Sequence, residues 1–121
     1  MRKHLGTLVI VALICLALPA APVLAQKLSF SIVTGGTGGV WYPLGGAIGG
    51  VIGKNVPNTD ATAEVTTAAI DNLKLLTAGK AGMAFAYDYH TVWAYEGKIS
   101  ELSKKQPVRI VMGFYEQPRT S

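Results

Sequence analysis

The sequence has almost no cysteine, and this scarcity excludes several kinds of site. Cys15 is the single cysteine among 121 residues and lies inside an apolar run near the start of the chain. A lipidated cysteine would need a small residue directly before it and a leucine three residues before it, where this chain has Ile14 and Ala12. Beyond residue 25 there is no thiol, so disulfides and thiolate metal sites are excluded there.

Histidine is equally scarce, and charge is thinly spread. His90 is the single histidine beyond residue 25, and one imidazole without a second ligand makes no zinc site. It has no serine or cysteine nucleophile paired with it, and no two carboxylates obviously converge for acid–base hydrolysis.

Without Arg2 and Lys3, the chain has nine basic and seven acidic residues, a net charge of about +2. The basic residues are scattered, which disfavours nucleic-acid and polybasic membrane surfaces.

The first 25 residues have the pattern of a secretory signal peptide. A basic start at Arg2 and Lys3 precedes an unbroken apolar run from Leu8 to Leu18, and Pro19 follows. Small residues then stand where a signal peptidase cleaves, and we predict cleavage after Ala25. The apolar run is shorter than the ~20 residues that span a bilayer, which disfavours an uncleaved anchor.

Residues 26–121 are enough for one small domain and show alternating strand and helix patterns. Helices are expected with Pro43 in the first turn, from Ile70 to a stop at Gly79, and from a cap at Asp88 to Gly97. Strands are predicted at 28–32, 61–65, 83–86 and 108–112. This order predicts an α/β fold with a mostly parallel sheet flanked by helices.

The first predicted helix is unusually rich in glycine. Each glycine inside a helix costs about 1 kcal/mol relative to alanine, so this helix should form only when packed closely against the sheet. The glycines concerned are Gly45, Gly46, Gly49, Gly50 and Gly53.

A glycine-rich turn from Thr34 to Pro43 connects the first strand to this helix. A dinucleotide fingerprint would need glycine at Trp41, and Gly53-Lys54-Asn55 comes too late for a phosphate loop and lacks its hydroxyl. Two interpretations remain. The turn is either purely structural or a carboxylate cradle at the helix start. The cradle would have Trp41 and Tyr42 as walls and, as donors, Thr37, Gly38, Gly39 and Val40.

Polar side chains also follow the next two strands. Because the carboxyl ends of parallel strands face one crevice, Thr66 and Thr67 should converge on the same space as the glycine-rich turn. Helix capping is the alternative role for both threonines. Asn72, one turn into the second helix, either binds a ligand amide or is solvated.

The third strand contributes further candidates. Tyr87 is expected to line the crevice, and Tyr115 is a further candidate wall. Asp88 is interpreted as a helix cap and His90 as a helix-surface residue.

Three ordered motifs carry a family resemblance: Gly35 to Gly45, Ala63-Glu64-Val65-Thr66 running into Asp71-Asn72-Leu73, and Gly79-Lys80-Ala81 before Met83-Ala84-Phe85. Together they resemble the TAXI family of extracytoplasmic solute receptors of TRAP transporters. The resemblance implies a periplasmic-binding-protein type II fold, in which two α/β lobes on a hinge close over a small solute. It also implies a periplasmic location, permease membrane subunits as partners, and no cofactor.

Family receptors are much longer, so residues 26–121 correspond to the N-terminal part of the first lobe, as in a truncated chain. The resemblance implies that the ligand is surrounded by Thr37, Gly38, Gly39, Val40, Trp41, Tyr42, Thr67, Asn72, Tyr87 and Tyr115. The chain departs from the family at Thr66-Thr67-Ala68-Ala69, where Thr-Gly-Gly-Ser is frequent, and at Gly82, where aspartate is frequent. Tyr87 replaces a frequent glutamine, which points to a solute different from the amino acids and dicarboxylates of relatives.

These observations predict a receptor that captures a small carboxylate-bearing solute, an amino acid or organic acid, and does not change it chemically. Two alternatives stay open. A secreted small α/β enzyme would need a nucleophile or convergent carboxylates, and a non-functional truncated fragment would show the same resemblance.

Overall fold

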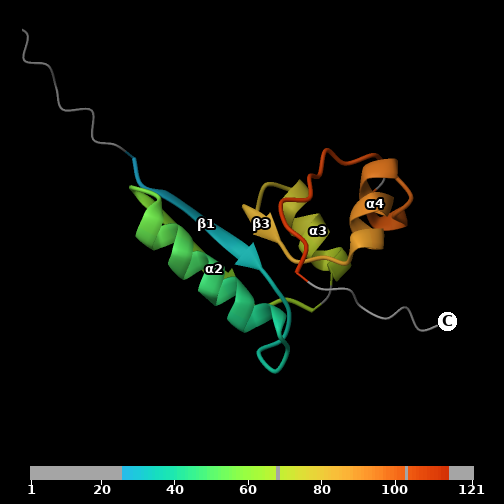
Figure 1. Cartoon of the computed structure of the whole chain (residues 1–121). Coiled ribbons are helices and arrows are strands. Elements are labelled where there is room, and N and C mark those ends of the chain that lie inside the picture. The colour runs from blue at the N-terminus through green and yellow to red at the C-terminus, as the bar shows by residue number, and fades with distance from the viewer. Residues whose placement is uncertain (1–25, 68, 103, 115–121) are drawn as a thin grey trace, which may run out of the picture.

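The structure is a computed structural model that describes residues 26–67, 69–102 and 104–114. Strands and helices alternate along these residues, as the sequence predicts, and a short 3₁₀ helix ends the series (Figure 1). The elements are β1 (Leu28–Val33), α2 (Trp41–Asn55), β2 (Thr59–Glu64), α3 (Ala69–Thr77), β3 (Met83–Ala84), α4 (Asp88–Glu96) and η1 (Ser100–Leu102).

The described strands form one parallel sheet in the order β2-β1-β3. β1 pairs with β2 along its whole length, from Leu28 opposite Thr59 to Val33 opposite Glu64. β3 joins only at the carboxyl end of β1, with Ile32 opposite Met83. The chain therefore moves to one side of β1 and then to the other, and right-handed crossovers of this kind place successive helices on opposite faces. Figure 1 shows α2 along one side of β1 and α3 and α4 on the other, which confirms the predicted α/β fold.

The glycine-rich helix α2 packs directly on the backbone of the sheet. A Cβ at Gly49 would lie 2.3 Å from the carbonyl oxygen of Ala61, and one at Gly45 would lie 2.5 Å from the Thr34 methyl carbon. Gly45 and Gly49 are the two buried residues of this helix. The predicted close packing of the helix on the sheet is confirmed, because only glycine fits at these two positions.

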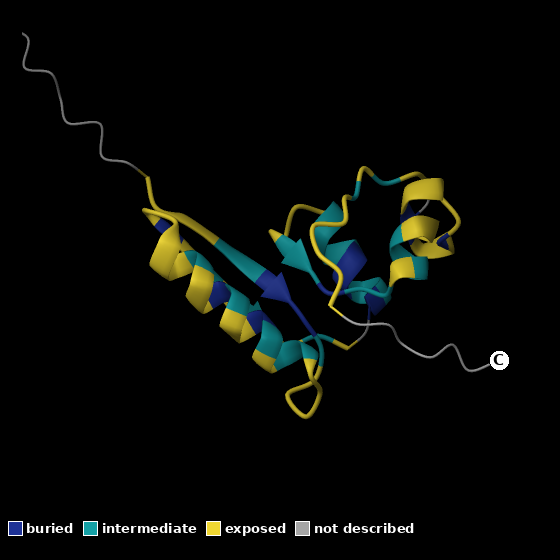
Figure 2. Cartoon of the chain, viewed as in Figure 1, coloured by how far each residue is buried: buried dark blue, intermediate teal, exposed yellow. Residues whose placement is uncertain are grey.

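The opposite side of the sheet has a core of apolar side chains. Its buried residues are Leu73 on α3, Ala94 on α4, and Ile99 and Leu102 around η1. Burial on the sheet itself increases along β1, from the exposed Leu28 to the fully buried residues at its carboxyl end (Figure 2). The most deeply buried part of the sheet is therefore the carboxyl end of β1, where β3 joins.

Two local predictions are wrong. In the described part of the chain the sheet has three strands, and the expected fourth strand at 108–112 has no ladder. Its apolar residues Ile110 and Val111 are exposed, and the two-residue β3 offers few edge groups for pairing. The N-cap of α4 is Tyr87, not Asp88, which is the first helical residue and accepts a hydrogen bond from the Tyr89 N–H (2.8 Å). α2 begins at Trp41, so Pro43 lies in the first turn of this helix, as predicted.

Across the residues described, none of the helices combines the length and the apolarity needed to cross a bilayer.

Candidate functional site

The turns that follow β1, β2 and β3 meet around one hollow of about 480 Å³. This is the carboxyl edge of a parallel sheet whose strand order reverses at β1, the usual place for a ligand in an open α/β fold. The first turn and the start of α2 supply half of the lining, and the starts of α3 and α4 supply the rest. The lining residues are Gly35, Gly36, Gly39, Val40, Trp41, Thr67, Ala69, Ile70, Tyr87 and His90.

A buried amide holds the three strand ends together. Asn72, on α3, is fully buried, and its Nδ2 donates to the carbonyl oxygens of Thr34 (2.6 Å) and Phe85 (2.7 Å). Its Oδ1 accepts a hydrogen bond from the Thr66 hydroxyl at 2.5 Å. Thr34 in turn donates both its N–H (3.0 Å) and its hydroxyl (2.8 Å) to the carbonyl of Glu64. Asn72 thus uses both donors and its carbonyl inside the protein, where buried polar groups need partners.

Aromatic rings form one wall of the hollow. The Trp41 ring lies 5.0 Å from the Tyr87 ring, at 57°, and 5.8 Å from the Phe85 ring behind it. Tyr87 also contacts His90, with 5.6 Å between ring centroids. Because these rings come from the start of α2 and the start of α4, two separate turns create one apolar wall.

The three helix starts around the hollow differ in charge. α3 has Asp71 in its first turn and α4 has Asp88, whereas the first turn of α2 has no acidic residue. The N-cap of α2 is Val40, whose side chain makes no capping hydrogen bond. Carboxylates at a helix start offset its partial positive charge. Of these three helix starts, α2 alone lacks an acidic residue of its own.

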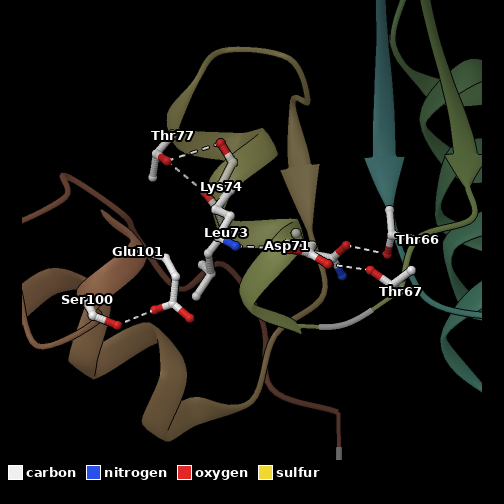
Figure 3. Close-up of polar contacts among 9 residues, drawn as sticks. Thr66, Thr67, Asp71, Leu73, Lys74, Thr77, Ser100 and Glu101 are labelled. Atoms are coloured by element: carbon white, nitrogen blue, oxygen red, sulfur yellow. Dashed lines mark hydrogen bonds and ion pairs between the residues drawn. The ribbon is translucent and has the colours of Figure 1, made fainter. Parts of the chain in front are cut away.

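Asp71 is itself held by its neighbours. The Thr67 hydroxyl donates to one carboxylate oxygen of Asp71, and the Lys74 ammonium lies 3.2 Å from the other (Figure 3). The hydrogen bond from Thr67, followed by the hydrogen bond and charge of Lys74, lowers the pKa of the Asp71 carboxyl. Asp71 therefore stays ionised beside the hollow at neutral pH.

Five of the site residues that the sequence predicts are part of the lining of the hollow. They are Gly39, Val40, Trp41, Thr67 and Tyr87.

The other candidates lie elsewhere. Thr37 and Gly38 are exposed in the turn and Tyr42 is half-buried on α2, but none of them lines the hollow. Asn72 lies among the strand ends instead of facing a ligand or solvent. The N–H of Gly39, expected to bind an anion, donates to the Gly36 carbonyl at 3.0 Å because the turn closes on itself. Tyr115 falls outside the described residues.

Sequence reasoning missed His90, which it placed on the helix surface. The imidazole lines the hollow and contacts the rings of Tyr87, Tyr89 and Trp93. Its Nδ1 is buried and has no hydrogen-bond partner, and burial lowers the pKa of the ring. The three-residue spacing from Tyr87 could have shown the contact, because residues three apart lie on one side of a helix.

Within the three described segments, no group of three or more His, Cys, Asp or Glu side chains could hold a metal ion.

The chain belongs to the NMT1-like family, whose model matches residues 32–120 and thus every residue around the hollow. This is a periplasmic-binding-protein-like family of solute-binding proteins of transport systems, not a family of enzymes. Membership implies a small solute ligand and a membrane transporter as partner. The predicted solute-receptor class is confirmed in this broad form, and the assignment to the TAXI family stays a prediction.

Proposed function

We propose that this protein is the extracytoplasmic receptor of a TRAP-type transporter, of the TAXI kind, and captures a small carboxylate-bearing solute. The observation that carries the proposal is the start of α2, which opens on the shared hollow with no acidic side chain of its own. The starts of α3 and α4 around the same hollow both have one. A ligand carboxylate would supply the missing negative charge.

The partial positive charge at a helix N-terminus favours a carboxylate at the start of α2. The first turn of a helix has N–H groups without intrahelical partners and carries a partial positive charge. An anion placed there gains about 0.3–1 kcal/mol in exposed geometry and up to about 2 kcal/mol when partly buried. The walls from Trp41 and Tyr87 would partly exclude water and strengthen that attraction.

Transport would follow from differential binding. In this proposal the chain is exported, cleaved after Ala25, and acts as the opening part of a first lobe that closes with a second lobe over the solute. A ligand that contacts both lobes favours the closed form, because it binds that form more tightly than the open one. The closed receptor would then deliver the solute to the permease subunits in the membrane.

A charge placed at the start of α2 tests the proposal. Val40→Asp puts a carboxylate on the exposed N-cap residue. There it should accept hydrogen bonds from N–H groups of the first helical turn and repel a ligand carboxylate. Isothermal titration with a panel of carboxylates and amino acids should show binding to the unchanged protein and at least about tenfold weaker binding to this variant. Each ligand that binds should also be recovered intact.

Two controls separate charge from shape. Val40→Asn adds a side chain of similar size without charge and should weaken binding much less than Val40→Asp. Val92→Asp places the same charge on an exposed valine of α4 that does not line the hollow, and should leave affinity unchanged. Equal affinity of the unchanged protein and Val40→Asp for every carboxylate that binds would contradict the proposal, as would chemical turnover of the ligand.

A further inference from the structure

We infer that the solute is an aromatic monocarboxylate, with its ring packed among Trp41, Tyr87 and His90 and its single carboxylate at the start of α2. This inference rests on the proposed function and narrows the class of solute that the hollow accepts. It depends on two features of the lining, the rings and the absence of charge.

The rings form a wall against which a flat guest could pack. Trp41 and Tyr87 are tilted by 57° with centroids 5.0 Å apart, and Tyr87 and His90 are tilted by 56° with centroids 5.6 Å apart. A guest ring can approach such a wall in offset-stacked or edge-to-face geometry, which adds attraction beyond its apolar area. Val40, Ala69 and Ile70 supply the remaining apolar surface.

The volume also suits a ring. At about 480 Å³ the hollow falls within the usual range of small-molecule sites, roughly 300–1,000 Å³. A small aliphatic acid would leave most of this apolar lining in contact with water. A ring joined to a carboxylate would cover the wall and reach the helix start together.

The charge pattern disfavours a second carboxylate. Among the described lining residues there is no lysine, arginine, aspartate or glutamate. The nearest charges on the starts of α3 and α4 are the carboxylates of Asp71 and Asp88, and Lys74 is already paired with Asp71. Burial favours the neutral form of the His90 imidazole, so this ring supplies no reliable cation. A second carboxylate would be partly desolvated without a partner.

Matched probes test the inference by isothermal titration. Phenylacetate and indole-3-acetate carry a ring and one carboxylate, cyclohexylacetate keeps the carboxylate but has a saturated ring, and succinate has two carboxylates. Phenylacetamide keeps the ring and loses the charge. At least one aromatic acid should bind about tenfold or more tighter than cyclohexylacetate and succinate. Phenylacetamide should bind more weakly than phenylacetate.

Variants assign the preference to the wall. Trp41→Leu should reduce the preference for the aromatic acid to less than about threefold, and Trp41→Phe should keep most of it. If circular dichroism shows that Trp41→Leu is unfolded, Tyr87→Leu serves the same purpose. Tyr95→Leu removes an exposed aromatic from α4 that does not line the hollow, and should change nothing.

The outcomes separate this inference from the proposed function. If cyclohexylacetate or succinate binds as tightly as both aromatic acids, the inference is overturned while a carboxylate receptor stands. If phenylacetamide matches phenylacetate, the carboxylate role fails while the ring site stands. If none of the five probes binds, the inference is overturned, and the wider carboxylate panel decides the proposed function.

Discussion

The two sides of the sheet are held by different kinds of contact. On one side α2 lies against the sheet through two glycines: Gly49 meets the backbone of β2 at Ala61, and Gly45 meets the Thr34 and Ala63 side chains. On the other side α3, α4 and η1 interlock through side chains around Leu73 and Ala94. Larger side chains at the glycines should therefore destabilise the first side, whereas smaller side chains in the apolar core should destabilise the second.

This difference bears on the site. Close approach of α2 brings its first turn to the carboxyl end of β1, where the helix start faces the hollow. The side-chain core opposite holds α3 and α4, whose first turns complete the lining. A site formed from both sides depends on both kinds of packing.

Adding a methyl group to the α2 side should have the largest effect on stability. In Gly49→Ala the new Cβ would overlap the Ala61 carbonyl oxygen, and the helix must shift, at a cost of about 3 kcal/mol. Gly50→Ala is the matched control, because its Cβ meets nothing within 4 Å and alanine favours a helix by about 1 kcal/mol. Urea unfolding followed by circular dichroism measures both. Equal midpoints for the two variants would show that α2 does not rest on the sheet backbone.

A smaller loss is expected where the two sides are joined. Asn72→Leu removes the amide that bridges the ends of β1 and β3, leaving the Thr34 and Phe85 carbonyls short of donors. The expected cost is about 2 kcal/mol in the free energy of unfolding. Thr66→Val removes the hydroxyl that donates to the Asn72 Oδ1 and to the Thr34 carbonyl, and should cost about 1 kcal/mol. If Asn72→Leu cost no more than Thr66→Val in the same urea experiment, the amide would not be the main link.

The smallest effect is a pH dependence from His90. Burial lowers its pKa in the folded chain, so near the ordinary imidazole range the unfolded chain binds more protons than the folded one. Stability should therefore fall as pH decreases through about 6.5, and level off below the folded pKa. His90→Gln should reduce the change in the urea unfolding midpoint between pH 7.5 and pH 5.5. An unchanged slope in this variant would place the titration elsewhere.

Much of the fold follows from local patterns. Alternating apolar residues after Leu28 and helical spacing from Ile70 indicate their elements directly, and Gly97, with φ of 77°, ends α4 as expected. The glycines of α2 predict its close packing on the sheet, which the structure has at Gly45 and Gly49. Trp41, Thr67 and Tyr87 were predicted to face one crevice because strand ends of a parallel sheet share one edge, and all three line the hollow.

The sequence by itself determined the α/β class, the edge where the turns gather, and the absence of thiol chemistry beyond residue 25. Tertiary structure alone decided that Asn72 links the strand ends instead of contacting a ligand. It also decided that the Gly39 N–H donates to a carbonyl within its own turn and that His90 lines the hollow. Periodicity reports which face of an element is apolar, whereas the partner of a polar group depends on distances between segments far apart in the chain.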